Sequence, residues 1–373
     1  MASIYLHIPF CKQACFYCDF HFSTSLKNKS ALVEALATEL MLRKAELKEE
    51  VSTIYFGGGT PSLLTREELA FLFQIIYEHF QVSGQAEITL EANPDDLTEE
   101  KIKQLAQTPV NRLSIGVQSF FDQDLQLMNR AHRAEEAENS LKMASCYFDN
   151  LSLDLIYGIP GMNLDRWQQN IEKALSFDIP HISAYALTVE PKTALQKMIQ
   201  TGKIAPLEEA LAEEHYRLLV SILTDNNYIN YEFSNFGKLG YFSQNNTAYW
   251  TGKHYMGVGP SAHSFDGTTR RWNIRNNSLY IQSIQAGQVP AEMEVLTLAD
   301  RYNEYIMTGL RTMFGVSIEQ VKTDFGEQYQ QYLLEQAAGL IQKGWLEIDQ
   351  QTLRLTAQGK FLGDGIAAEL FWV

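Results

Sequence analysis

The stretch Ile8–Cys18 reads IPFCKQACFYC and brings Cys11, Cys15 and Cys18 together on one short segment. The chain has four cysteines in total, so most of its thiols lie in this one place. Such crowding indicates a metal site. Three thiolates on one loop can hold three irons of a 4Fe-4S cubane and leave the fourth iron without a protein ligand. An open iron of this kind can bind a small molecule.

A structural zinc site is the main alternative for these cysteines. It requires a fourth protein ligand, and His7 or His21 lies close enough in sequence to supply one. A zinc-stabilised barrel would bind some other nucleotide and would contain zinc in place of iron and sulfide. Disulfides are not expected, because a chain of 373 residues is not a small cysteine-rich secreted scaffold.

Length and composition predict a globular protein with one large domain and one smaller one. Apolar residues make up 45% of the chain and aromatic residues 12%, which excludes a disordered or fibrous protein. The net charge of −15 opposes nonspecific attraction to nucleic acid, so we expect no nucleic-acid partner. No charged leader or bilayer-length apolar run is seen. We therefore expect no transmembrane segment and a cytoplasmic location, where cysteines stay reduced.

The first part of the chain alternates short β-branched or apolar runs with longer amphipathic stretches. This alternation is typical of repeated βα units around a parallel sheet, and it predicts an α/β fold with a partial (β/α)6 TIM-like barrel over residues 1–235. Between the second and third predicted strands, Thr65 and Glu68 predict a capping box at a helix start. The predicted strands are Ile4–Ile8, Thr53–Phe56, Glu87–Glu91, Arg112–Gly116, Leu151–Ile156 and His181–Ala186.

The remaining chain divides into two parts by composition. Residues 236–290 are rich in aromatic, Asn and Gly residues without a clear helical period, which predicts an irregular connector that closes the barrel. Residues 291–373 show helices followed by a hairpin of Gly344–Ile348 and Thr352–Thr356. That order predicts a small C-terminal α+β domain that is winged-helix-like. The acidic charge balance favours packing or partner contact over nucleic-acid binding for this domain.

Polar and glycine residues follow the carboxyl ends of the predicted strands, where parallel α/β folds place their ligand sites. Gly57–Pro61 reads GGGTP, and glycines there let the backbone approach a ligand, although a tight turn explains them equally well. Glu91 could bind an amine or a ribose hydroxyl, and Asp154 another hydroxyl. Gln118 and Arg130 could bind a carboxylate. Each residue alone is compatible with a surface role, but together they suit a zwitterionic nucleoside.

The spacing Cys-x3-Cys-x2-Cys followed by GGGTP resembles the radical S-adenosylmethionine (SAM) superfamily, in which a 4Fe-4S cluster binds the methionine part of SAM at its open iron. Further motifs resemble the oxygen-independent coproporphyrinogen oxidase branch of that superfamily over essentially the whole chain. These motifs are His7–Cys11 (HIPFC), Glu91–Pro94 (EANP), Ser114–Phe120 (SIGVQSF), Asp154–Pro160 (DLIYGIP), Gly257–Ser264 (GVGPSAHS) and Leu353–Gly359 (LRLTAQG), the last in the branch's extra domain.

The resemblance implies roles for individual residues. Cys11, Cys15 and Cys18 would ligate the cluster, and an electron donor would deliver the electron that cleaves SAM reductively to a carbon radical. The cofactor would supply this reactivity, and the barrel would shield it. The residues implied to contact SAM are Tyr5, Tyr17, Gly58, Gly59, Thr60, Glu91, Gln118, Arg130, Asp154 and Ala186.

Two groups within this branch differ in function. The oxidases carry a further cysteine two residues beyond the third cluster ligand, where this chain has Phe20, and an arm before the first strand, which this chain enters soon after Met1. Both differences resemble the HemW-type haem chaperones instead. That resemblance implies that the protein binds haem, passes it to an unidentified acceptor protein and lacks oxidase activity. The alternative is a coproporphyrinogen III oxidase, which carries out anaerobic oxidative decarboxylation in porphyrin biosynthesis.

One motif departs from the chaperone pattern. The pattern His-Asn-x-x-Tyr-Trp corresponds to Asn245–Trp250 (NNTAYW), with asparagine in place of histidine. Because an asparagine amide is a poor haem-iron ligand, another side chain would have to bind the iron. His254 and His263 are the nearest candidates. Tyr249 and Trp250 could pack against a porphyrin plane or seal the barrel.

Overall fold

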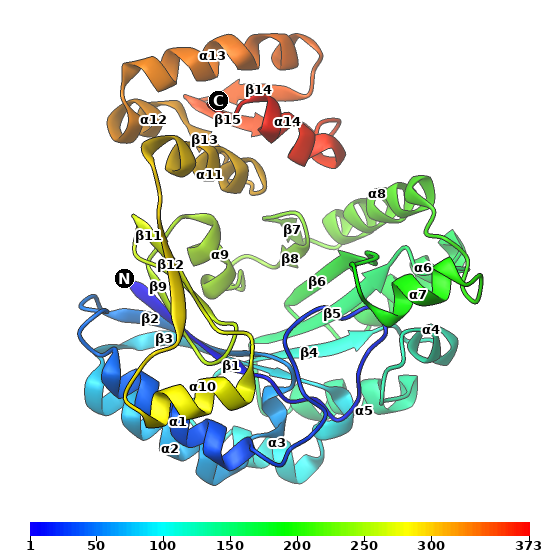
Figure 1. The fold of residues 1–373 in the computed structure, drawn as a ribbon. Helices are drawn as coiled ribbons and strands as arrows, with labels where there is room; N and C mark the ends of the chain where they lie inside the picture. The colour runs from blue at the N-terminus through cyan, green and yellow to red at the C-terminus, as the bar shows by residue number, and fades with distance from the viewer.

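The structure, a computed structural model, describes all residues from Met1 to Val373. Its central feature is a parallel sheet in which β1 to β6 are neighbours in chain order (Figure 1). This arrangement confirms the predicted partial (β/α)6 barrel. The strands are β1 (Ala2–Ile8), β2 (Val51–Gly58), β3 (Val82–Ala92), β4 (Arg112–Gln118), β5 (Leu151–Tyr157) and β6 (His181–Ala186).

Helices cover the outer, convex face of this sheet (Figure 1). The predicted capping box is present at the start of α2, where the Thr65 hydroxyl accepts from Glu68 N (3.2 Å) and the Glu68 carboxylate accepts from Thr65 N (2.8 Å). Short 3-10 turns follow β2 (Pro61–Leu63, η1) and β3 (Pro94–Asp96, η2). The helices are α1 (Lys29–Leu42), α2 (Arg66–His79), α3 (Glu99–Leu105), α4 (Asp122–Leu127), α5 (Ala134–Ala144), α6 (Leu164–Leu175), α7 (Ala194–Gln200) and α8 (Glu209–Asp225).

The connector over residues 236–290 is regular, so the prediction of an irregular segment was wrong. Strand β9 pairs in parallel with β1, and β10 to β12 continue the sheet antiparallel beyond that edge. These strands have only three to five residues, too few to show a period in sequence, and each depends on pairing with its neighbour, beginning with β9 on β1. The elements of the connector and of its two flanks are β7 (Ile229–Asn230), β8 (Asn235–Gly237), α9 (Gln244–Trp250), β9 (Tyr255–Val258), β10 (His263–Phe265), β11 (Thr269–Asn273), α10 (Asn277–Gln285) and β12 (Ala291–Val295).

The C-terminal unit has a hydrophobic core of its own, separate from the barrel core. Its helices and its three-stranded sheet, with the order β13-β15-β14, agree with the winged-helix-like prediction, and η3 and α14 extend it. Strand β12 still belongs to the large sheet, so the unit begins with α11. Its elements are α11 (Leu298–Leu310), β13 (Val316–Ser317), α12 (Ile318–Phe325), α13 (Glu327–Gln342), β14 (Leu346–Asp349), β15 (Thr352–Leu355), η3 (Lys360–Leu362) and α14 (Gly363–Glu369).

Two backbone hydrogen bonds join this unit to the barrel beside β7. Phe233 N donates to Arg311 O (3.1 Å), and Met313 N donates to Tyr231 O (2.9 Å). The unit therefore lies above the open side of the sheet, as Figure 1 shows in orange and red. None of the helices in the structure combines the length and the hydropathy that crossing a bilayer requires.

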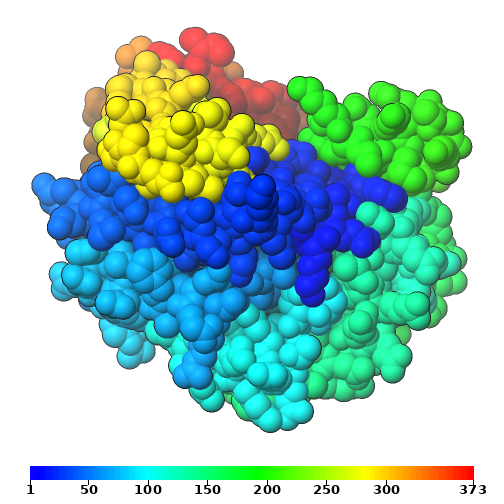
Figure 2. Space-filling view, turned by 60° about the horizontal axis from the view of Figure 1, so that its bottom comes forward, coloured from blue at the N-terminus to red at the C-terminus, as the bar shows by residue number.

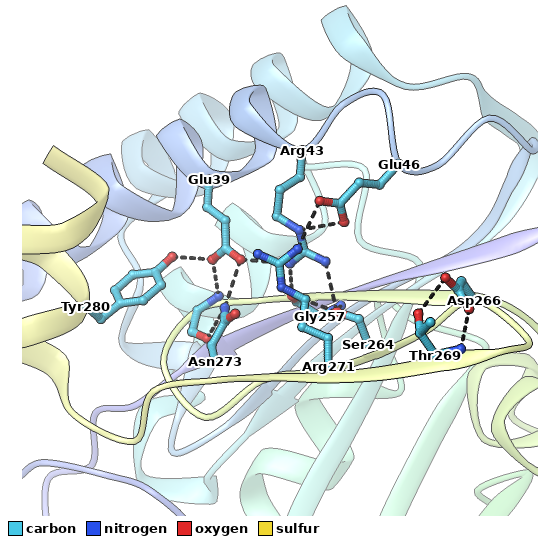
Figure 3. Close-up of polar contacts among 11 residues, drawn as sticks. Glu39, Arg43, Glu46, Gly257, Ser264, Asp266, Thr269, Arg271, Asn273 and Tyr280 are labelled. Atoms are coloured by element: carbon cyan, nitrogen blue, oxygen red, sulfur yellow. Dashed lines mark hydrogen bonds and ion pairs between the residues drawn. The ribbon is translucent and has the colours of Figure 1, made fainter. Parts of the chain in front are cut away.

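A buried ion pair on α1 fixes the connector to the barrel (Figure 3). Glu39 accepts from Arg43 Nη1 (2.8 Å) and from the Tyr280 hydroxyl of α10 (2.5 Å). Arg43 also donates to Gly257 O (2.7 Å) and to the Ser264 hydroxyl (3.0 Å). Since both charges are almost completely buried, each depends on the other and on these polar partners.

Replacing Arg43 by alanine should therefore leave the Glu39 carboxylate buried and unpaired. We expect a loss of about 3–5 kcal/mol in the free energy of unfolding, measured by denaturant titration. Arg271→Ala is the control, because Arg271 forms a partly exposed pair with Glu46 (3.1 Å) and its loss should cost about 1 kcal/mol or less. Equal losses in the two variants would contradict this role of the buried pair.

Candidate functional site

The carboxyl ends of the barrel strands and the facing side of the C-terminal unit enclose a cavity of about 1280 Å³. The strand ends meet there as the sequence predicted. Every residue predicted to bind the cluster or SAM, except Tyr5, contributes to its lining. These residues are Cys11, Cys15, Cys18, Tyr17, Gly58, Gly59, Thr60, Glu91, Gln118, Arg130, Asp154 and Ala186.

The cysteine loop follows β1 and runs along the molecular surface, in dark blue between the yellow connector and the green helices of Figure 2. Cys11 N donates to Ser23 O (3.1 Å), and Phe16 N donates to Met128 O (3.1 Å). These two hydrogen bonds anchor the first and the second half of the loop. Partial burial raises the pKa of the Cys18 thiol to about 11 and also raises that of Cys11, so a cationic centre is needed to keep them as thiolates.

The donor set fits a three-thiolate cluster better than a zinc ion. No three His, Cys, Asp or Glu side chains lie close enough to share one ion. His7 uses both ring nitrogens, with the Tyr5 hydroxyl (3.1 Å) and with His21 O (2.9 Å), and His21 Nε2 bonds to Asn277 (2.7 Å). Zinc draws all its ligands to about 2.0–2.3 Å of one point. A cubane binds each thiolate at a different corner, so it does not require the three thiols to meet at one point.

The glycine turn after β2 packs directly against the cysteine loop. A Cβ at Gly59 would lie 2.7 Å from Phe10 O and 2.8 Å from Ile8 O, so only glycine fits there. Gly58 has a φ of +108°, which also favours glycine. Its N–H donates to Glu91 Oε2 (3.1 Å), so this amide serves the protein's own carboxylate. The turn both positions Glu91 and leaves room for the loop.

Two carboxyl groups, Glu91 on β3 and Asp154 on β5, face the cavity. Glu91 accepts from the Tyr55 hydroxyl (2.8 Å), and Asp154 accepts from the Ser114 hydroxyl (3.3 Å). Burial raises the pKa of Glu91 to about 7 and that of Asp154 to about 6. Hydrogen bonds from the hydroxyl or ammonium groups of a ligand would stabilise the ionised form of each carboxyl group.

Arg130 links the cysteine loop to the barrel. Its Nη1 donates to Cys15 Sγ (3.4 Å), and its Nη2 donates to Asn93 (2.7 Å) and to Gly116 O (2.9 Å). A Cβ at Gly116 would come within 3.2 Å of the guanidinium and 2.9 Å of Gln118. Asn93 and Gly116 are thus site residues that we did not predict individually, although both lie in motifs quoted above. A role for Arg130 and Gln118 in carboxylate binding stays a prediction.

Tyr5 lies beneath the cavity, three residues before β1 ends. Its ring stacks on Tyr55 with centroids 6.0 Å apart, and it limits the space around Gly57, where a Cβ would lie 2.9 Å from it. Tyr5 therefore supports the floor in this structure, and its contact with a cofactor stays a prediction. Tyr17 lines the cavity, where burial raises the pKa of its hydroxyl.

The outer part of the cavity was missed by the sequence analysis. It is formed by the end of β6, by α8 and by the C-terminal unit, and sequence alone does not indicate which face of that unit meets the barrel. We call its main residues the outer wall. They are Tyr185, Tyr216, Phe233, Trp345, Lys360 and Phe361.

The candidate haem ligands proposed from sequence lie elsewhere. Asn245 is buried at the start of α9, where its N–H donates to Glu87 (3.1 Å), and no residue of α9 lines the cavity. His254 pairs with Glu49 (2.6 Å), and His263 lies on β10, so neither reaches the cavity. The position that the chaperone pattern gives to histidine is therefore a structural one in this chain.

Comparison with known proteins finds similarity along nearly the whole chain. Residues 5–174 match the Radical SAM superfamily, and residues 296–362 match the HemN C-terminal domain. The chain is 35% identical to the Heme chaperone HemW of Bacillus subtilis, over 98% of each chain. It is 33% identical to the Heme chaperone HemW of Lactococcus lactis, over 98% of this chain and 96% of that relative. The chain belongs to the HemW family of radical SAM proteins.

A solved structure shares the fold of the HemW family. Coproporphyrinogen III oxidase (HemN) from Escherichia coli, described as a radical SAM enzyme, superposes with a TM-score of 0.86. The superposition covers 99% of this chain and 90% of that chain at 23% identity. This likeness confirms the architecture. Family membership confirms the predicted cofactors, because a 4Fe-4S cluster and SAM are the cofactors of radical SAM proteins. The assignment of Cys11, Cys15 and Cys18 as the cluster ligands stays a prediction.

Replacing Cys15 by alanine should abolish cluster assembly, because the open-iron cluster needs all three thiolates. We expect iron and acid-labile sulfide to fall to background after anaerobic reconstitution, with the circular dichroism spectrum unchanged. Cys146→Ala is the matched control, since Cys146 is an exposed thiol outside the site. Wild-type iron content in the Cys15 variant would show that the ligand assignment is wrong.

The two raised carboxyl pKa values predict a pH effect on stability. The unfolded chain loses these protons near pH 4, whereas the folded, cluster-free protein keeps them up to pH 6–7. The folded state binds more protons in this window, so its stability falls as pH rises through it. Replacing Glu91 by Gln and Asp154 by Asn should make the decrease in the free energy of unfolding between pH 5 and pH 8 smaller by about 1–2 kcal/mol. This figure already allows for screening of the two groups by water in the cavity. The free energy of unfolding is measured by denaturant titration at each pH. If it depends on pH in the same way in the variant and in the wild type, this assignment is contradicted.

Proposed function

We propose that the protein is a haem chaperone, which binds haem and transfers it to an acceptor protein. The observation that carries this proposal is the similarity along nearly the whole length of both chains to relatives named heme chaperones. That similarity includes the cysteine loop, the connector and the C-terminal unit together. The acceptor protein and the electron donor are expected partners without an identity, and the cytoplasmic location stays a prediction.

A coproporphyrinogen oxidase is the alternative, because that enzyme shares the fold. Phe20 distinguishes the two functions. It lines the cavity with 67% of its surface exposed, at the position where the oxidase pattern has a further cysteine. A phenyl ring cannot donate a proton or ligate a metal. This apolar residue supports the chaperone assignment over the decarboxylation.

The chain's own residues would hold the cofactors in the inner part of the cavity. Cys11, Cys15 and Cys18 would bind the cluster, and Glu91 and Asp154 would accept hydrogen bonds from the amine and hydroxyl groups of SAM. When bound, the cluster and SAM supply one-electron and radical chemistry.

Anaerobic haem titration of the reconstituted protein tests the proposal. We expect a saturable absorption band that corresponds to one haem per chain, and no sustained consumption of coproporphyrinogen in the presence of SAM and a reductant. Failure to form the band at micromolar haem would contradict the chaperone function. Sustained decarboxylation would instead identify an oxidase.

The variants His254→Ala and His263→Ala serve as controls in the same titration. Neither side chain reaches the cavity, so both variants should bind haem with wild-type affinity. A large loss of affinity in either one would place haem outside the cavity.

A further inference from the structure

The cavity is larger than one small-molecule ligand requires. Pockets for single small molecules span about 300–1,000 Å³, compared with about 1280 Å³ here. Most of the predicted SAM residues lie at or just beyond the ends of β1 to β5, and only Ala186 lies at the end of β6. The outer wall bounds the rest of the space, between β6, α8 and the C-terminal unit. The cavity therefore offers a second ligand region beside the cofactor region.

Aromatic rings dominate the outer wall, and they come from both units of the chain. Tyr185 at the end of β6 is 43% exposed, and Phe361 of η3 is 46% exposed. Phe233 contacts the C-terminal unit, since a Cβ at Gly363 would lie 2.4 Å from its ring. Exposed rings that line one cavity from two units suit a large, flat and mostly apolar ligand.

Lys360 is a cation without an anionic partner in this wall. Its Nζ donates to the Asn230 side-chain oxygen (2.7 Å), and burial alone lowers its pKa, with no carboxylate acting on it. The nearby Asp364 is already paired with Arg311 (2.7 Å). Arg130, the other basic residue of the lining, is bonded to Cys15 and to the barrel. Lys360 is thus the basic group available to an anionic ligand.

We propose that the outer wall is the haem-binding site and that Lys360 pairs with a haem propionate. This inference rests on the proposed chaperone function and deepens it. A porphyrin has the flat apolar plane that the rings of Tyr185, Trp345 and Phe361 accommodate, and its propionates supply the missing negative charge. The plane lies between the barrel and the C-terminal unit, beside the cluster and SAM.

Haem held in this way contacts both units at once. The backbone bonds of Tyr231 and Phe233 to Met313 and Arg311 join the units next to the site. Haem at this site would therefore lie against both units, next to the bonds that join them.

Paired titrations with haem and haem dimethyl ester test the proposal, because the ester removes the propionate charges and needs no change in the protein. We expect the wild type to bind the ester roughly tenfold more weakly than haem, as the loss of one charged hydrogen bond predicts. Lys360→Met should weaken haem binding by a similar factor and should no longer distinguish haem from the ester. Lys360→Arg should retain the preference.

Lys322→Met is the matched control, since Lys322 lies on α12 and pairs with Glu327 (3.0 Å) away from the cavity. It should behave as the wild type. If the wild type and Lys360→Met bind haem and its ester equally well, the outer-wall site is overturned while the chaperone function stands. If the wild type binds no haem at all, the proposed function itself fails. Thermal unfolding of each variant confirms that it is folded.

Discussion

The close contact between the glycine turn after β2 and the cysteine loop is the constraint on which the site depends. Because Gly59 has no side chain, the backbone of Ile8 and Phe10 can lie against it, and the loop turns its thiols toward the cavity. Arg130 adds a second attachment through Cys15. Two independent supports thus fix a loop that lies at the surface, and they keep three thiols around one space.

The barrel and the position of the three cysteines at the cavity could be predicted from sequence because their signals are local. A β-branched run marks a buried strand without knowledge of its neighbours, and Thr65 with Glu68 marks a helix start within four residues. Cysteine spacing is equally local. Carboxyl ends of parallel strands share one edge, so Glu91 and Asp154 could be placed at the site before their contacts were known.

The missed features depend on contacts between distant segments. Strand β9 forms because β1 offers an unpaired edge, and Lys360 reaches the cavity because the C-terminal unit docks beside β7. The role of Asn245 depends on the buried Glu87, which its backbone N–H satisfies. A linear pattern suggested a haem ligand there. The structure shows a capped helix that does not line the cavity, so residue 245 is not positioned to bind a ligand there.

The central claim is that three cysteines hold a cluster whose fourth iron is open to SAM. Mössbauer spectroscopy of the ⁵⁷Fe-reconstituted protein, recorded with and without SAM, tests it most directly. The account predicts that one iron in four changes its isomer shift when SAM is added while the other three keep theirs. Four irons that are all insensitive to SAM, or protein that takes up zinc and no iron, would contradict it.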